Sequence, residues 1–304
     1  MTSRFYPIGT PGLAWGVDEI KAWRARQQRR RSYADQVLSV VDGLRDRFEV
    51  VRYGRLDYAP DAYPLVALRG RRWRGDRPVA LVTGGVHGYE TSGVMGALRF
   101  AAGHAAAYED RLDVLIAPCV SPWGFERIHR WNPQALDPNR SFRPDSPAPE
   151  SAALMALVAP VAERVRVHVD LHETTDTDES EFRPALAARD GLPFTPGGIP
   201  DGFYVVDDAQ SPQPGFQQAI IEAVSRVTHI APADARGEII GSPAVAPGVI
   251  RYALRSLGLC AGITDAPYRT TTEVYPDSPR ATPQICNAAQ VAAVCAALDY
   301  VLAC

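Results

Sequence analysis

Residues 78–104 have the sequence PVALVTGGVHGYETSGVMGALRFAAGH, and this stretch decides the fold class. It begins with a short, continuous apolar run over 78–86, which is typical of a strand buried on both faces of a sheet. It ends with TSGVMGALRFAAGH at 91–104, which indicates a helix. Between the two, His87 and Glu90 follow the strand in quick succession. A buried strand that leads directly into a helix is typical of an α/β fold.

The alternation of strands and helices continues on both sides of this stretch. We predict further strands at 48–58, 63–70, 113–120, 165–171, 260–267 and 270–276, and further helices at 17–46, 149–165, 215–227, 248–258 and 284–303. This pattern predicts an α/β fold with a mixed, largely parallel sheet. Residues 174–216 are rich in Asp, Pro and Gly, and we expect long loops there. No linker or internal repeat divides the chain, so we expect one domain over 1–304, with an N-terminal helical extension over about residues 1–45.

The charge of the chain argues against several classes of function. The formal net charge is −3, which gives no reason to expect nucleic acid or an anionic membrane as the main partner. The basic cluster RARQQRRR at 24–31 is interpreted as a solvated helix face. Lys21 is the only lysine, so no lysine stands where a Schiff base or a phosphate-binding loop would need one.

The cysteines and apolar runs bear on the compartment. The five cysteines are Cys119, Cys260, Cys286, Cys295 and Cys304, and their odd number and wide spacing indicate reduced thiols rather than disulfides. No apolar run approaches the roughly 20 residues of a membrane span. The N-terminus lacks the basic and apolar regions of a signal peptide. We therefore expect a cytoplasmic protein that does not bind membranes.

Polar side chains follow the buried strands, where open α/β sheets form their sites. His87 and Glu90 follow one strand, and His172 lies at the end of another. Two histidines and a glutamate can supply three protein ligands to zinc and leave a fourth position for water. Each of these features alone is weak evidence for a metal site, because the pattern H-x-x-E is common and a lone histidine is more often a hydrogen-bonded core residue. A serine hydrolase is disfavoured because the sequence has no G-x-S-x-G motif. A dinucleotide-binding dehydrogenase is disfavoured because no G-x-G-x-x-G motif follows a strand.

Several separated motifs, in the right order, make the sequence resemble the zinc carboxypeptidase superfamily, including its aspartoacylase and succinylglutamate desuccinylase branch. The motifs are GGVHGYE at 84–90, SPWGFER at 121–127, DPNRSF at 137–142, VDLHETT at 169–175 and, more loosely, TTTEVYPDSP at 270–279. One departure is Ser121, where the carboxypeptidases have Asn. The resemblance implies a three-layer α/β/α fold with a central mixed, largely parallel twisted sheet, and one Zn²⁺ per chain.

The resemblance implies that His87, Glu90 and His172 bind the zinc ion. Such a site polarises a carbonyl and acidifies a water molecule. A ligating histidine needs an acceptor for its other ring nitrogen, and Asp137 is similar in position to the family's partner of the first histidine. Asp137 is equally compatible with an ordinary turn before Pro138.

The resemblance also implies residues that bind the substrate. Asn139 and Arg140 match the pair that holds a free substrate carboxylate, and the planar guanidinium suits a bidentate contact with it. A second arginine would stabilise the oxyanion of the attacked carbonyl. Arg127 and Arg130 both lie in the matching interval, and we favour Arg130 because "RW" resembles the "TRY" of the aspartoacylase branch.

Glu273 is the expected general base and acid, which would take a proton from the activated water and deliver it to the leaving nitrogen. Glu173 directly follows His172, but neighbouring residues on a strand point to opposite faces, so it should face away from the metal. Asp265 is a weaker rival. No tyrosine could be matched to the substrate-capping tyrosine of the digestive carboxypeptidases; Tyr204, Tyr268 and Tyr275 stay unassigned.

The sequence leaves the substrate open. A peptide that loses its C-terminal residue and an N-acyl amino acid both fit, and each carries a free carboxylate. The VDLHETT motif favours the N-acyl amino acid, whereas SPWGFER favours the peptide, which we place slightly ahead. The alternative to an enzyme is a catalytically inactive homologue that binds a metal or a ligand. The position of Glu273 distinguishes the two, because without a glutamate beside the metal the site has no base.

Overall fold

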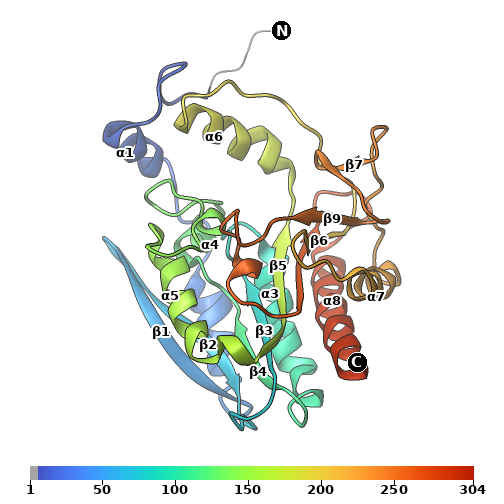
Figure 1. Cartoon of the computed structure of the whole chain (residues 1–304). Helices are drawn as coiled ribbons and strands as arrows, with labels where there is room; N and C mark the ends of the chain where they lie inside the picture. Colours follow the sequence, from blue (N-terminus) through green and yellow to red (C-terminus); the bar gives the residue numbers. More distant parts are fainter. Residues whose placement is uncertain (1–5) are drawn as a thin grey trace.

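The computed structural model describes residues 6–304, and its main feature is an eight-stranded sheet (Figure 1). The strand order is β1-β2-β4-β3-β5-β10-β6-β9. These strands are β1 (Phe48–Tyr58), β2 (Asp61–Gly70), β3 (Val79–Gly84), β4 (Asp113–Ala117), β5 (Val165–Glu173), β6 (Tyr204–Asp208), β9 (Val249–Tyr252) and β10 (Tyr268–Val274). The central strands β4, β3, β5 and β10 run parallel, whereas β1–β2, β2–β4 and β10–β6 pair antiparallel. The predicted α/β class with a mixed, largely parallel sheet is confirmed.

Helices cover both faces of the sheet. The helices α3 (Thr91–Gly103), α7 (Pro214–Ser225) and α8 (Pro283–Ala303) pack on one another over one face. The helix α5 (Pro149–Val158) and the short η6 (Cys260–Gly262) contribute to a second core on the other face. The remaining elements are η2 (Ala105–Ala107), α4 (Pro122–Arg127), η3 (Pro138–Arg140), η4 (Ala159–Arg164), η5 (Asp178–Phe182), α6 (Arg183–Arg189), β7 (Glu238–Ile239) and β8 (Ser242–Pro243).

The two cores explain the continuous apolar runs. Along β3, Ala80 and Val82 join the core under α3 and α8, whereas Val79 and Leu81 join the core on the other face. Successive side chains of a strand point to opposite faces, so a strand covered on both sides must be apolar throughout. On β5, Val167, Val169 and Leu171 enter the first core. The same alternation directs His168, Asp170 and His172 toward the opposite face.

The prediction of one helix over 17–46 is wrong. The segment forms α1 (Val17–Ala25), a π-helical turn η1 (Ala34–Leu38) and α2 (Ser39–Asp42), and it is not helical over 27–32. There the backbone N–H groups of Arg30 and Arg31 donate to Glu126 O, at 2.7 and 3.2 Å, instead of continuing a helix. Figure 1 shows α1 and α6 at one end of the molecule, beyond the sheet. The predicted single domain and its extension include residues 1–5, outside the described residues, and stay predictions.

Two further assignments are wrong near the edge of the sheet. Residues 248–258 do not form a helix, because Val249–Tyr252 pairs with β6 as the strand β9. Residues 260–267 do not form a strand; they form η6 and bends beneath β5 and β10. The predicted loops over 174–216 contain η5, α6 and β6. Each of these segments is short, so its local pattern is ambiguous and long-range pairing decides its conformation.

The last helix, α8, is long and apolar enough to cross a membrane by length and composition alone. We expect no such segment from the lengths of the apolar runs in the sequence. In the structure, half of the apolar window of α8 is buried inside the protein, where it packs on α3, α7 and the strands β5 and β10. An apolar helix with this environment is typical of a protein core.

Candidate metal centre and active site

His87 and Glu90 lie in the loop that joins β3 to α3. Gly88 passes the backbone of α4 so closely that a Cβ atom there would lie 2.0 Å from Gly124 C and from Phe125 N. Gly85 has a φ of 61°, in the left-handed region that glycine adopts without strain. These glycines allow the tight path of the loop. The loop ends at Glu90, which is the N-cap residue of α3 and directly precedes Thr91.

His172 comes from the end of β5 and meets this loop. His87 Nδ1 lies 2.7 Å from Glu90 Oε1, and His172 Nδ1 lies 2.7 Å from Glu90 Oε2. The two imidazole rings lie 5.0 Å apart, nearly perpendicular, at 74°. One ligand atom from each residue lies within 4.8 Å of the other two, and all three residues are buried. The structure thus brings together the three ligands that the resemblance implies.

The donor set fits a zinc ion. Glu90 Oε2 and His172 Nδ1 are close, yet neither has a hydrogen-bond partner among the described residues. Unpartnered polar atoms in a protein interior cost free energy, and their convergence on one point is the arrangement of a group that could hold a metal ion. Burial alone would raise the pKa of Glu90, but the two histidines outweigh it and lower this pKa to about 2, so the carboxylate is charged. Two imidazoles and one carboxylate form a common catalytic zinc site.

Two carboxylates hold the histidines in this orientation. Asp137 Oδ1 lies 2.9 Å from His87 Nε2, and Asp170 Oδ2 lies 2.8 Å from His172 Nε2. Each pair turns Nδ1 of the histidine toward Glu90 and the proposed metal position. Asp137 is where the resemblance implies it, whereas the contact of Asp170 with His172 is a finding of the structure. The sequence contains a signal for this contact: Asp170 and His172 lie two residues apart on a predicted strand, so their side chains share a face.

A second group of potential ligands lies behind Asp170, formed by His168, Asp170 and Cys260. The hydroxyl of Thr83 occupies the space between them: Thr83 Oγ1 lies 2.6 Å from Asp170 Oδ1, 2.9 Å from His168 Nε2 and 3.6 Å from Cys260 Sγ. The centre of this group is therefore already filled. The group supports the carboxylate that orients His172.

Glu273 lies beside the metal position, on β10. In the parallel pair of β5 and β10 it is directly opposite His172, and Thr174 Oγ1 donates a hydrogen bond of 2.9 Å to Glu273 Oε2. Burial raises the pKa of Glu273 to about 8, against the opposing charge of His172. The two other acidic residues considered as the base, Glu173 and Asp265, have other partners. Glu173 accepts the N–H groups of Thr91 and Ser92 at the start of α3, and exposed Asp265 pairs with Arg255.

The two candidate arginines of the oxyanion site differ in position. Arg130 lines the same cavity as His87, donates to Asp137 Oδ2 at 3.0 Å and lies 3.3 Å from Asp178 Oδ1. Arg127 instead pairs with Asp61 at 2.6 Å and does not line this cavity. Burial alone would raise the pKa of Asp137. The positive charges of Arg130 and His87 outweigh this effect and hold the pKa well below its usual value.

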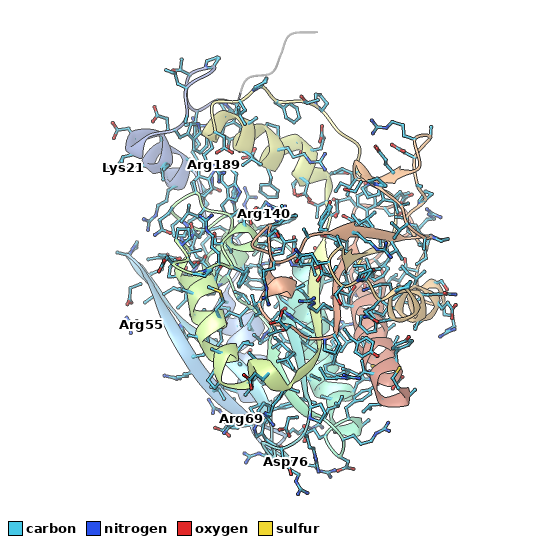
Figure 2. The ribbon with its side chains drawn as sticks, viewed as in Figure 1. Lys21, Arg55, Arg69, Asp76, Arg140 and Arg189 are labelled. Atoms are coloured by element: carbon cyan, nitrogen blue, oxygen red, sulfur yellow. The ribbon has the colours of Figure 1, made fainter. Side chains whose placement is uncertain are left out.

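Arg140 and Asn139 also line the cavity but are used differently. Arg140 is exposed, and its one side-chain hydrogen bond is to the carbonyl oxygen of Asn139, at 2.7 Å. Figure 2 shows Arg140 between the sheet and α6. Asn139 is buried; its Oδ1 accepts the N–H of Cys260 at 2.7 Å, and its Nδ2 lies 3.4 Å from His172 Nε2. Arg140 is therefore available to a ligand, whereas the carboxamide of Asn139 is largely engaged within the protein.

The cavity that joins these residues has a volume of about 740 Å³. One wall is apolar and includes Trp15 and Ile20 from the N-terminal segment, together with Trp131 and Leu186. The ring of Trp15 packs edge-on against that of Trp131, and the backbone N–H of Trp15 donates to Arg189 O at 2.8 Å, which ties the segment to α6. Sequence reasoning missed this wall, because nothing in residues 1–45 indicated which surface they cover.

Of the tyrosines left unassigned, Tyr204 lines the cavity, with its hydroxyl 2.8 Å from Thr174 Oγ1, whereas Tyr268 and Tyr275 do not. His129 does not line the cavity and packs against Trp23, with ring centroids 4.8 Å apart. His129 therefore has a structural position in the aromatic cluster behind the cavity.

Comparison with known proteins agrees with this geometry. The family model of the succinylglutamate desuccinylase/aspartoacylase catalytic domain matches residues 76–188, a range that contains His87, Glu90 and His172 and ends before Glu273. The sequence matches none of the curated proteins.

Solved structures extend the likeness over the whole fold. A candidate metallopeptidase from Shewanella denitrificans is 20% identical, with a TM-score of 0.62 over 99% of this chain and 98% of its own. A metallo-carboxypeptidase from Burkholderia cenocepacia is 15% identical, with a TM-score of 0.60 over 88% of this chain and 69% of its own. A metallo-carboxypeptidase from Pseudomonas aeruginosa, in complex with (2-guanidinoethylmercapto)succinic acid, is 14% identical, with a TM-score of 0.57 over 88% of this chain and 68% of its own.

At these identities the solved structures show the fold, which is that of the carboxypeptidases. Together with the family model, they confirm the resemblance to the zinc carboxypeptidase-like superfamily, including its aspartoacylase and succinylglutamate desuccinylase branch. The related families are hydrolases, which supports an enzymatic function for this chain.

Proposed function

We propose that this protein is a zinc-dependent hydrolase that cleaves an amide bond next to a free carboxylate, as a peptidase of the metallocarboxypeptidase type. The observation that carries the proposal is a shared cavity. The proposed ligand His87, the half-buried Glu273 and Arg140 all line it, and the guanidinium of Arg140 pairs with no carboxylate of residues 6–304. This combination provides a metal ligand, a base and a carboxylate-binding group within reach of one small substrate.

The residues around the metal position have complementary tasks. A zinc ion held by His87, Glu90 and His172 would polarise the substrate carbonyl and acidify a water molecule. Glu273 accepts the proton of the attacking water on its carboxylate and then donates it to the leaving nitrogen. Thr174 Oγ1 donates to Glu273 Oε2 and so holds the carboxyl group in position for both proton transfers.

The arginines act on the charges of the substrate. Arg130 is held beside the centre by Asp137 and Asp178, where its guanidinium stabilises negative charge on the attacked carbonyl oxygen. Arg140 binds the free carboxylate, because its side chain is exposed in the cavity and pairs with no acidic residue in the described part of the chain. Asn139 supports this contact through its carbonyl oxygen, which accepts from Arg140.

The size of the cavity favours a peptide. A volume of about 740 Å³, with an apolar wall of Trp15, Ile20 and Leu186, exceeds the needs of a small N-acyl amino acid and suits a substrate with further side chains. A deacylase of N-acyl amino acids is the second candidate. It is favoured by the match of residues 76–188 to the succinylglutamate desuccinylase/aspartoacylase model.

One substrate panel separates these functions. N-blocked dipeptides with a free C-terminus are compared with the same dipeptides amidated, and with N-acetyl and N-succinyl amino acids. We expect hydrolysis of the free dipeptides, about one zinc per chain, and no turnover by Glu273→Gln at the same zinc content. Cleavage of the N-acyl amino acids alone would establish the deacylase instead. If the zinc-loaded protein cleaves nothing, the chain is an inactive homologue and the proposed function fails.

A further inference from the structure

Arg31, in the N-terminal segment, makes side-chain hydrogen bonds to the loop that carries the proposed metal ligands. Arg31 Nη2 donates to Gly88 O at 2.8 Å, and Nη1 donates to Thr91 Oγ1 at 2.8 Å. Gly88 lies between the ligands His87 and Glu90, and Thr91 directly follows Glu90. The guanidinium therefore bridges the loop that carries both ligands, from a segment more than fifty residues earlier in the chain.

The other contacts of Arg31 fix where this bridge is anchored. Arg31 Nε donates to Phe125 O at 2.6 Å, and the guanidinium carbon lies 3.6 Å from the centre of the Phe125 ring. No carboxylate of residues 6–304 lies within ion-pair distance of Arg31, so its donors are satisfied by neutral acceptors of the ligand loop and of α4. A half-buried cation with this environment depends on these acceptors to offset the loss of hydration.

The ligand loop is held from the opposite side by Glu173. Its carboxylate accepts the N–H of Thr91 at 2.9 Å and the N–H of Ser92 at 2.8 Å. Glu173 follows the third ligand, His172, on β5. Thr91 is thus fixed to β5 by its backbone and to Arg31 by its hydroxyl. These two contacts together determine where Glu90 lies relative to His172.

We propose that Arg31 is a positioning residue of the metal centre, which holds His87 and Glu90 at the spacing that a zinc ion requires. The inference rests on the proposed function, because it presupposes that these residues bind zinc. It assigns a role to the N-terminal segment beyond lining the cavity with Trp15 and Ile20: through Arg31, the segment sets the metal affinity. Groups that orient metal ligands typically change metal affinity by about tenfold to a hundredfold when removed.

Arg29 provides a matched control. It belongs to the same segment, and its Nε donates to Glu126 Oε2 at 2.6 Å. Glu126 also accepts from Tyr33 N and from the Tyr63 hydroxyl, at 2.9 Å each, so it keeps partners when Arg29 is removed. Arg29 has no hydrogen bond to the ligand loop. Arg29→Ala therefore weakens the anchoring of the segment without touching Gly88 or Thr91.

The test measures zinc affinity in the full-length protein by competition with a chromophoric chelator, for wild type, Arg31→Ala, Arg31→Lys and Arg29→Ala. The unfolding temperature of each metal-free variant is recorded alongside. We expect Arg31→Ala to raise the zinc Kd about tenfold. Arg31→Lys should lie between Arg31→Ala and wild type, because lysine can replace only part of the contacts, and Arg29→Ala should keep the wild-type Kd. The visible spectrum of the Co²⁺-loaded protein should change with Arg31→Ala and should keep its wild-type form with Arg29→Ala.

Three outcomes would overturn the inference. One is an unchanged Kd in folded Arg31→Ala, and another is an equal loss of affinity in Arg29→Ala, which would point to the segment as a whole. If Arg31→Ala does not fold, Thr91→Val carries the test, because it removes the hydroxyl acceptor and keeps the shape; an unchanged Kd there contradicts the inference. These outcomes differ from failure of the proposed function, in which the wild-type protein itself would not bind zinc.

Discussion

His172 and Glu273 are directly opposite each other in the parallel pair of β5 and β10. Side chains at paired positions of adjacent strands share a face, so the proposed third metal ligand and the proposed base are neighbours by the register of the sheet itself. A slip of this register by one residue would turn Glu273 to the other face. The catalytic arrangement therefore depends on strand pairing rather than on a mobile loop.

Replacing Glu273 by Gln should abolish turnover without releasing the metal. The amide cannot accept the proton of the attacking water, and general base catalysis typically contributes about 10²–10⁴-fold in rate. Glu273 is not one of the three converging ligands, so the zinc content should equal that of wild type. Hydrolysis assays with metal analysis of the same preparations check both statements. Unchanged activity would require the base to be another residue.

Removal of the metal should lower stability as well as activity. A ligand that binds only the folded state at a free concentration of 100 times its Kd adds about 2.7 kcal/mol to the free energy of unfolding. We therefore expect a chelator to lower the unfolding temperature, and added zinc to restore it. His172→Ala should show no such zinc dependence. If neither the chelator nor added zinc changes the unfolding temperature of the wild-type protein, the proposed metal site is contradicted.

Asp170→Asn should weaken zinc binding by about tenfold to a hundredfold, because the carboxylate that holds His172 Nε2 loses its charge. The matched control is Asp113→Asn. Asp113 is also buried, but it lies at the start of β4, where it accepts from Arg164 and from the N–H of Gly75. Metal titration of both variants separates the two effects. Equal losses of affinity would mean that general destabilisation, not the orientation of His172, is measured.

Arg140→Ala should reduce kcat/KM for substrates with a free carboxylate and spare their amidated counterparts. A hydrogen bond to a charged group contributes about 1.5–3 kcal/mol, which corresponds to roughly tenfold to a hundredfold in kcat/KM. The amidated substrates, although slower, provide the internal control, since they lack the charge that Arg140 binds. A parallel loss on both substrate types would argue for a structural role of Arg140.

His129 should make the metal-free protein sensitive to acid. Burial lowers the pKa of His129 from 6.5 to about 3, so the unfolded chain binds a proton over this window and the folded chain does not. Stability is therefore fully present above pH 6.5 and is lost as the pH falls toward 3, by up to about 1.4 kcal/mol per pH unit for one such group.

Urea unfolding of the metal-free protein at pH 7.5, 5.5 and 4.5 measures this dependence. His129→Gln should show a shallower loss of stability on acidification than wild type. His104→Gln is the control, because His104 is exposed and should leave the pH dependence unchanged. The same slope in wild type and His129→Gln would assign the acid sensitivity to other groups.

The core of the fold could be predicted from local patterns. The runs that form β3, β4 and β5 are apolar throughout because both of their faces are covered, and α3 and α8 are long enough to be recognised. Prediction failed for short segments such as 248–258, because their apolar residues fit a helix and an edge strand equally well. There the pairing of Val249–Tyr252 with β6 decided the outcome.

The sequence by itself determined the residue types of the site, because His87, Glu90 and His172 stand at fixed places after apolar strands and in recognisable motifs. Only the tertiary structure decided how the other groups are used. It separated Arg130, which faces the cavity, from Arg127, which pairs with Asp61, and it turned Asp170 toward His172. The physical reason is that a sequence specifies the face on which a strand residue lies, whereas its neighbours on that face depend on contacts between distant segments.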